Sequence, residues 1–466
     1  MHKVAVIGLD CADPHLVFDR WLDELPNLRA LVRRGLWGPL RSVDPPITVP
    51  AWTCMLSGRD PGELGIYGFR NRRDYGYDGL AIADSGAVRL DRVFDLASRA
   101  GKHVILQGIP QTSPPVAVNG ELISCFLTAD PRTDPYTHPP QLRDEIETVL
   151  LGGYKVDVRN FRSDDRDRIL AEVFEMTEQH FAAARHLLDT RAWEFFMTVE
   201  IGVDRMHHAF WRFVDPRHPR FEPGHRYGDA VRAYYRYLDE ELGELLERFD
   251  DDTAVLVVSD HGARAMEGAI CVNEWLAQEG YLVLREEPNG VTPWRKAQVD
   301  WTRTRAWGEG GYYCRLCLNV EGREPQGIVG HDEYDSLRDE LIARLEALPG
   351  PHGPIGTRVH RPEELWSATN NVAPDLVVYF GDLAWRSAGS IGHGRHWTFE
   401  NDTGPDDANH AKNGICIMTG PGLAAERRDD LVIYDVAPTI LQLLGVPIPD
   451  AMRGRPLAND RVAPRA

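Results

Sequence analysis

The chain has 466 residues, of which 43% are hydrophobic and 26% are charged. These values are ordinary for a globular protein with one large domain that carries insertions, or with two domains. With 52 Lys and Arg against 71 Asp and Glu, the net charge is −19. A chain this acidic is not expected to bind a nucleic-acid polymer or an anionic membrane, because both need a basic surface.

The sequence also bears on the compartment. Its first residues run directly into a strand pattern and lack the apolar segment of a signal peptide, and no later apolar stretch is long enough to span a bilayer. The seven cysteines are an odd number without paired spacing, which is typical of reduced thiols. We therefore expect a cytoplasmic protein without a membrane segment. The oligomeric state is not visible in the sequence.

The N-terminal third alternates between short strand and helix patterns. Residues 3–9 form an apolar run that predicts a buried strand ending at Asp10. Residues 26–35 have helical spacing and stop at a glycine, and Pro50 opens a short helix over residues 51–56. A helix over residues 92–100 and a strand over residues 103–106 follow.

The rest of the chain repeats this alternation, with two interruptions. Residues 128–168 are rich in Pro, Asp and Arg and resemble an insertion or lid, and residues 285–364 lack the strand–helix rhythm and predict an inserted cap. Helices are expected over residues 169–188, 227–249 and 435–445. Strands are expected over residues 193–203, 253–259, 375–380 and 414–418.

This order predicts an α/β fold with a mostly parallel central sheet and helices on both faces. Residues 1–284 and 365–466 would form the core, with the lid-like insertion at 128–168, and residues 285–364 the cap subdomain. Ligands of such sheets bind at the carboxyl ends of the strands. Three predicted strands end in an acid there, namely Asp10, Asp204 and Asp260.

Histidines accompany two of these acids. Asp260-His261 joins a carboxylate and an imidazole at the mouth of a strand, which suits a divalent transition metal. Asp204 and His208 would share one face if the chain turns helical there, although a shift of one residue would bring His207 to the same place. A second ion would need another histidine, and His410 lies nearest to a predicted strand.

Thr48 is a candidate nucleophile. It precedes Pro50 at the start of a predicted helix, where open backbone N–H groups and the helix dipole favour an anion. A free threonine hydroxyl is a poor nucleophile, but a bound metal lowers its pKa. By itself, Thr48 is better explained as an ordinary helix cap.

Together these motifs resemble the alkaline phosphatase superfamily over nearly the whole chain. The resemblance is strongest to the type I phosphodiesterase/nucleotide pyrophosphatase family, in particular to its bacterial predicted phosphohydrolases or phosphomutases. It rests on motifs found in the same order as in the superfamily: Leu9-Asp10, Pro26-Asn27-Leu28, Thr48-Val49-Pro50, Asp204-x-x-x-His208, Asp260-His261-Gly262, His410 and Asp435-Val436-Ala437-Pro438-Thr439.

The resemblance implies an alkaline phosphatase-like three-layer sandwich with inserted cap segments. It also implies two divalent ions, zinc in the first place and manganese as an alternative. Asp10, Thr48, Asp260 and His261 would hold one ion, and Asp204, His208 and His410 would hold the other. Thr48 would attack phosphorus and form a phosphothreonine intermediate. Such ions would also offset the acidity of the chain toward an anionic substrate.

The sequence departs from the family at one substrate contact. Nucleotide pyrophosphatases have an Asn after the T-x-P motif, and this chain has Ala51. Other side chains must then meet the phosphoryl charge, and the sequence offers Arg70, Arg305, Arg395, His396 and Lys412. The C-x-P-x-R motif of sulfatases is absent.

We therefore expect hydrolysis of a phosphodiester or pyrophosphate bond in a small phosphorylated substrate, such as a nucleotide derivative. A phosphomonoesterase or phosphomutase that acts on a small metabolite is the alternative. A non-catalytic binding protein on the same scaffold is a third reading.

Overall fold

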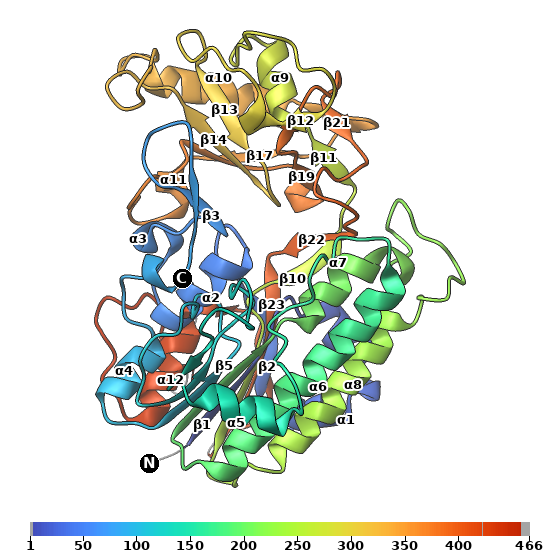
Figure 1. The fold of residues 1–466 in the computed structure, drawn as a ribbon, viewed down its shortest axis with the longest axis vertical. Coiled ribbons are helices and arrows are strands. Elements are labelled where there is room, and N and C mark those ends of the chain that lie inside the picture. Colours follow the sequence, from blue (N-terminus) through green and yellow to red (C-terminus); the bar gives the residue numbers. More distant parts are fainter. Residues whose placement is uncertain (1–2, 422, 458–466) are drawn as a thin grey trace.

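The computed structural model describes residues 3–421 and 423–457, so the ends of the predicted core range lie outside the described residues. Its main sheet has ten strands in the order β24-β2-β23-β9-β1-β8-β5-β6-β7, with β25 beside β2 (Figure 1). The five strands from β9 to β6 are parallel, whereas β23 and β7 run antiparallel to their neighbours. The strands are β1 (Val4–Leu9), β2 (Leu36–Arg41), β5 (Val104–Gln107), β6 (Gly120–Ile123), β7 (Thr137–His138), β8 (Phe195–Glu200), β9 (Ala254–Val258), β23 (Asn413–Thr419), β24 (Glu426–Arg427) and β25 (Leu431–Val432).

Helices cover both faces of this sheet, and alternation along the strands explains why. In β1, Ala5, Ile7 and Leu9 pack on one face, while Val4 and Val6 pack on the other. The first face is covered by α1 (Pro26–Val32), α5 (Leu142–Val149), α6 (Arg166–Thr190), α7 (Gly202–Val214) and α8 (Ala230–Leu246). The second is covered by α2 (Thr48–Ser57), α4 (Val93–Arg99) and α12 (Val436–Leu444). The predicted three-layer α/β architecture is confirmed.

The strand that precedes Asp204 is shorter than predicted. β8 ends at Glu200, and Asp204 lies in the first turn of α7 instead of at the strand end. The Glu200 carboxylate accepts a hydrogen bond from the Gly202 N–H at 2.7 Å, which favours the turn from strand to helix. Asp10 and Asp260 do follow β1 and β9 closely.

A second lobe lies above the carboxyl ends of the main sheet (Figure 1). Its antiparallel sheet has the order β13-β14-β18-β17, and a smaller sheet has the order β19-β11-β21. Although β18 follows residue 364, the predicted end of the cap, it belongs to this upper sheet. The domain limits themselves stay a prediction. The elements of the lobe are β11 (Gly268–Ile270), α9 (Val272–Gln278), β12 (Thr292–Pro293), β13 (Ala306–Glu309), β14 (Cys314–Leu318), α10 (Tyr334–Glu346), β15 (Pro349–Gly350), β16 (Gly353–Pro354), β17 (Arg358–His360), α11 (Pro362–Leu365), β18 (Leu376–Tyr379), β19 (Trp385–Ser387), β20 (Ser390–Ile391) and β21 (Trp397–Thr398).

Shorter segments join the two lobes. The hairpin β3–β4 rises from the core toward the upper sheet, and β10 pairs with β22 where the chain crosses between the lobes (Figure 1). The segment 128–168 contains β7 and α5, and α5 buries Leu142 and Ile146 against the core. The joining elements are α3 (Pro61–Leu64), β3 (Arg70–Arg72), β4 (Leu80–Ile82), β10 (Gly262–Ala265) and β22 (Ala408–Ala411).

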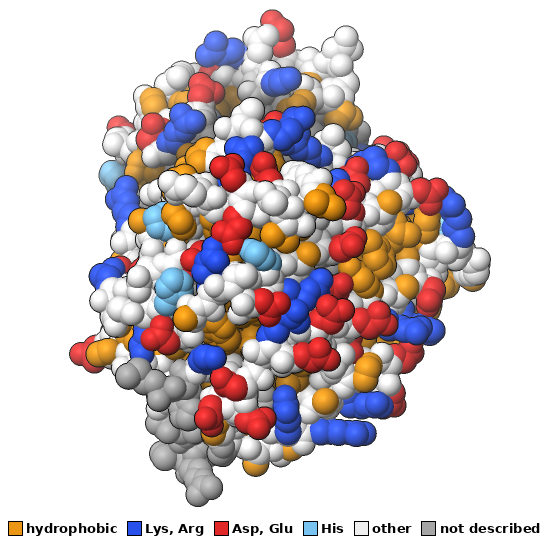
Figure 2. Space-filling view, turned by 60° about the horizontal axis from the view of Figure 1, so that its bottom comes forward, with side chains coloured by type: hydrophobic (Ala, Val, Ile, Leu, Met, Phe, Trp, Pro, Cys, Tyr) orange, Lys and Arg blue, Asp and Glu red, His pale blue; other side chains and the backbone are white. Residues whose placement is uncertain are grey.

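Two properties of the surface and the helices agree with the composition. Acidic and basic side chains are interspersed over the face drawn in Figure 2. Among residues 3–421 and 423–457, no helix combines the length and the apolarity that a membrane crossing requires.

Candidate active site

Thr48 is the first residue of α2 and is 2% exposed. Ile47 before it is extended, and Pro50 lies in the first turn, so the chain enters the helix sharply at the threonine. The Thr48 hydroxyl lies 3.2 Å from Nε2 of His261 and lines a cavity between the two lobes. Its side chain therefore faces the predicted metal ligands instead of capping the helix, because no side-chain cap is present at this terminus.

One group of candidate ligands comprises Asp10, Asp260 and His261. These residues follow the neighbouring parallel strands β1 and β9, and their ligand atoms lie within 4.8 Å of one another. The Trp52 Nε1–H donates to Oδ2 of Asp10 at 2.7 Å, and the Cys11 N–H donates to Oδ1 of Asp260 at 3.2 Å. The opposite oxygens, Asp10 Oδ1 and Asp260 Oδ2, accept no hydrogen bond from any described residue.

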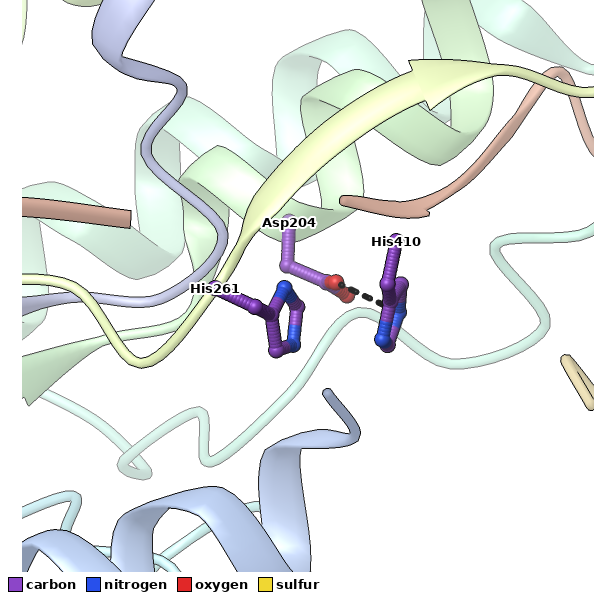
Figure 3. Close-up of side chains that lie close together, drawn as sticks. All are labelled: Asp204, His261 and His410. Atoms are coloured by element: carbon purple, nitrogen blue, oxygen red, sulfur yellow. Dashed lines mark ion pairs between the residues drawn. The ribbon is translucent and has the colours of Figure 1, made fainter. Parts of the chain in front are cut away.

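A second group comprises Asp204, His261 and His410, whose ligand atoms also lie within 4.8 Å of one another (Figure 3). Pairing of β10 with β22 places His410 opposite Ala263 and so beside His261. Nδ1 of His410 lies 2.8 Å from the Pro46 carbonyl, which holds the proton on that nitrogen. Nε2 of His410 and Oδ1 of Asp204 have no hydrogen-bond partner among the described residues.

His208 adjoins the second group. It lies one helical turn after Asp204, and its Nε2 is 3.2 Å from Asp204 Oδ1. Its Nδ1 is 2.7 Å from Oδ1 of Asp406, a carboxylate that is fully buried. His207 instead directs Nε2 to the Tyr235 hydroxyl at 3.3 Å. The helix thus orients His208, and not His207, toward Asp204.

Burial and mutual repulsion dominate the charges of this cluster. Burial, with the nearby Asp204 charge, raises the pKa of Asp10 well above its ordinary value, and burial with the Asp10 charge does the same for Asp260. Burial lowers the pKa of His261 to about 4 and also lowers that of His410. Neutral imidazoles and crowded carboxylates are the donors that a divalent cation binds and neutralises. The residues therefore fit a metal centre.

His208 differs because carboxylates surround it. Burial lowers its pKa, but the Asp406 and Asp204 carboxylates outweigh that effect and raise the pKa to about 9. A carboxylate that holds the second nitrogen of a histidine is a common support for a metal-binding imidazole. Sequence reasoning missed Asp406, because Asp406 and Asp407 follow a polar loop and no spacing rule connects them to His208.

Two further residues of the site were not foreseen. The Trp52 indole fixes Asp10, and its place one turn into α2 was the only signal for it. Tyr312, from the upper lobe, stacks on His208 with ring centroids 5.1 Å apart and lies 4.4 Å from His410. Its hydroxyl is 3.2 Å from Nε2 of His208. Side chains of both lobes therefore build the site.

The cavity above Thr48 has a volume of about 360 Å³. Of the five predicted substrate contacts, Arg70 lines it. The other four residues do not line it and have other partners: Arg305 faces Glu333 at 3.7 Å, Arg395 faces Thr398 at 3.4 Å, His396 faces Gln278 at 2.6 Å, and Lys412 faces Asp44 at 3.5 Å.

The fold, with its candidate Asp and His ligands beside a buried hydroxyl, is that of the alkaline phosphatase-like class of hydrolases. Residues 4–406 match the sequence model of the family described as type I phosphodiesterase/nucleotide pyrophosphatase. The chain belongs to this family and is a phosphohydrolase.

Solved structures share the fold at low sequence identity. Murine ectonucleotide pyrophosphatase/phosphodiesterase 5 is 15% identical with a TM-score of 0.56, and the match covers 96% of each chain. Phosphonoacetate hydrolase from Sinorhizobium meliloti 1021, in complex with phosphonoformate, is 17% identical with a TM-score of 0.62, and the match covers 96% of this chain and 95% of that one. An inactive form of the murine protein was solved in complex with AMP.

Proposed function

We propose that the protein hydrolyses a phosphodiester or pyrophosphate bond of a small phosphorylated substrate, such as a nucleotide derivative, through a phosphothreonine on Thr48. One observation carries the proposal. Four buried ligand atoms of Asp10, Asp204, Asp260 and His410 lack hydrogen-bond partners among the described residues, and all four surround His261 beside the Thr48 hydroxyl. Buried polar atoms in native proteins are normally satisfied, so four such atoms in one place support the proposal that this site binds cations.

The proposed ligand sets add Thr48 to the first group, and His208, the neighbour of Asp204, to the second. Asp10, Asp260, His261 and Thr48 would hold one divalent ion, and Asp204, His410 and His208 would hold the other. Bound there, the ions would lower the pKa of the Thr48 hydroxyl and neutralise charge on the phosphoryl oxygens. Oxygen and imidazole donors suit zinc and also admit manganese.

The residues of the chain then have separable roles. The Thr48 hydroxyl gives up its proton to water and its oxygen attacks phosphorus, and the bond between phosphorus and the leaving oxygen breaks. The open N–H groups at the start of α2 and its dipole favour the phosphoryl anion at this point. Water next attacks the phosphothreonine in line, and the Thr48 oxygen leaves. Trp52 and Asp406 hold Asp10 and His208 in place throughout.

The charges near Thr48 favour a diester over a monoester. A monoester carries one more negative charge on phosphorus and needs an additional cation. Arg205 beside Asp204 already pairs with Asp157 at 2.7 Å, and Arg162 pairs with Asp406 at 2.8 Å. Neither arginine is free to meet a second phosphoryl charge, and the other arginines of the cavity that lack a carboxylate partner, Arg70 and Arg315, form no hydrogen bond with a candidate metal ligand.

The experiment compares a diester, a monoester and a nucleotide sugar with purified protein reconstituted with Zn²⁺ or Mn²⁺. We expect the diester or the nucleotide sugar to be hydrolysed fastest, and Thr48→Ala to abolish turnover while Asp10, Asp260 and His261 still bind metal. Mass spectrometry of acid-quenched wild-type protein should locate a phosphate on Thr48. Full activity of Thr48→Ala would contradict the nucleophile, and a clear preference for the monoester would contradict the proposed bond.

We also propose that the protein works in the cytoplasm. All seven cysteines are free and buried, as is typical of a reducing compartment. Subcellular fractionation of the producing cells tests this, and recovery of the protein outside the cytoplasm would contradict it.

A further inference from the structure

The cavity is lined by more positively charged side chains than the binding of one phosphoryl group requires. Its lining includes five arginines but only one acidic residue, Asp204, in a protein whose net charge is −19. Three of the arginines have carboxylate partners: Arg162 pairs with Asp406, Arg205 with Asp157 and Asp204, and Arg386 with Asp402 at 3.3 Å. The remaining two, Arg70 and Arg315, form no ion pair with a described carboxylate.

The two unpaired arginines meet from opposite lobes. Arg70 lies in β3 of the core hairpin, and Arg315 lies in β14 of the upper sheet. Nη1 of Arg315 donates a hydrogen bond to the backbone carbonyl of Arg70, which brings the two residues together. No hydrogen bond or ion pair joins either arginine to a residue of the two candidate metal groups, although all of them except Asp10, Asp260 and His261 line the same cavity. The two arginines are therefore available to a different part of a bound substrate.

The guanidinium of Arg386 also indicates that this part of the cavity binds an anion. Arg386 is 5% exposed and lines the cavity, yet its Nε has no hydrogen-bond partner among the described residues. An unpartnered, deeply buried donor is costly unless a ligand or water satisfies it. Arginine also presents a planar fork that matches the two oxygens of a carboxylate or phosphate.

The phosphoryl group does not need these cations. Two divalent ions would offset the three carboxylates Asp10, Asp204 and Asp260 and leave one positive charge, which the Thr48 oxygen and the phosphoryl oxygens would share. Apolar side chains line the cavity as well, namely Phe69, Leu80, Ile82, Leu127 and Phe161. An organic group could pack on these walls and still carry a charged end to the arginines.

We propose that the substrate carries a second anionic group, a carboxylate or a phosphate, on the organic part attached to phosphorus, and that Arg70 and Arg315 bind this group with support from Arg386. The inference rests on the proposed function, because it assigns the phosphoryl group to the metal centre. It narrows the substrate class to diesters or pyrophosphates with an anionic end, and it predicts poor use of neutral diesters.

The test measures binding by titration calorimetry, on metal-loaded Thr48→Ala protein so that no probe is turned over. The probes are monomethyl alkylphosphonates of graded chain length that end in a carboxylate, each paired with its neutral carboxamide. A parallel series ends in a phosphonate and distinguishes the two kinds of anion. At the best length, we expect the charged probe to bind about tenfold or more tightly than its neutral partner. Added salt should weaken this preference.

Variants of Arg70 and Arg315 test whether these residues cause the preference for charged probes. Arg70→Met and Arg315→Met should each reduce the preference for the charged probe, and the double variant should nearly abolish it. Affinity for monomethyl methylphosphonate, which has no second charge, should stay unchanged. Arg315→Lys keeps the charge and should retain part of the preference. Arg99→Met serves as the control, because Arg99 lies on the surface of α4 and pairs with Asp91.

The outcomes separate the two proposals. Equal affinity for charged and neutral probes at every length, or a preference that survives the double variant, overturns the second anion site but leaves the metal centre intact. Failure of monomethyl methylphosphonate to bind, while charged probes bind through Arg70 and Arg315, contradicts the proposed function instead. Absence of binding by every probe contradicts both.

Discussion

Three candidate ligands of the site, Asp10, Asp260 and His410, each have one polar atom held by a hydrogen bond and the opposite atom without a hydrogen-bond partner among the described residues. The Trp52 indole holds Asp10, the Cys11 N–H holds Asp260, and the Pro46 carbonyl holds His410. The free atoms converge because the held atoms fix the rotation of each side chain. Support of this kind pre-organises a metal site, since little side-chain freedom is left to lose on binding.

Replacement of Asp406 by Asn tests this support. Asp406 lies 2.7 Å from Nδ1 of His208. The neutral amide of Asn would still reach this nitrogen, but it would no longer make the opposite nitrogen, Nε2, a stronger ligand for a metal ion. We expect about a 10- to 100-fold loss of metal affinity or activity. Competition with a fluorescent chelator measures the affinity. Asp215→Asn, a buried carboxylate that faces Trp211 and Arg217, is the matched control and should change neither quantity.

At the level of elements, strand ends were easier to predict than the segments that follow them. The apolar runs before Asp10 and Asp260 are unbroken, so their strand ends were readable. Before Asp204, apolar residues continue from the strand into the helix, and no pattern marks the change at Glu200. The approach of His208 to Asp204 could be predicted because helical spacing is local. The position of His410 beside His261 depends instead on the pairing of β10 with β22, which joins segments far apart in the sequence.

The turn after β1 contains a buried carboxylate, Asp13, that makes the stability of the fold depend on pH. Asp13 accepts a hydrogen bond from the Leu16 N–H at 3.0 Å, and burial raises its pKa from 3.8 to about 6. Between these values the folded state holds a proton that the unfolded state has lost. Stability from this group is therefore present below pH 4 and is lost as the pH rises toward 6, by up to about 3 kcal/mol.

Asp13→Asn removes this titration and keeps the acceptor oxygen for Leu16. We expect the variant to be more stable than the wild type at pH 7 by roughly 1–3 kcal/mol, with no difference near pH 4. Urea unfolding of the metal-free proteins at both pH values measures it. A difference of the same size at both values would show that the charge of Asp13 is not its cause.

At the scale of the whole molecule, the two lobes supply different side chains to the cavity. The core and the segments that join the lobes supply the candidate metal ligands and Thr48, while the upper lobe supplies Tyr312 and Arg315 to the same cavity. The family was recognisable from motifs in the core. The arginines of the cavity were not, apart from Arg70, because their convergence depends on how the lobes meet. In an acidic protein, this local excess of arginine provides the field that attracts an anion.

The proposed metal centre should stabilise the whole fold. Without cations, the buried Asp10, Asp204 and Asp260 carboxylates repel one another, so ions that bind only the folded state shift the unfolding equilibrium. A metal concentration a thousandfold above the dissociation constant adds about 4 kcal/mol. We expect scanning calorimetry to show a Tm several degrees lower after EDTA treatment, restored by Zn²⁺ or Mn²⁺. Asp260→Asn should lose most of this recovery, because it removes one ligand and part of the repulsion, while Asp215→Asn should keep it. An EDTA-treated wild type with an unchanged Tm and no bound metal would contradict a resident metal centre.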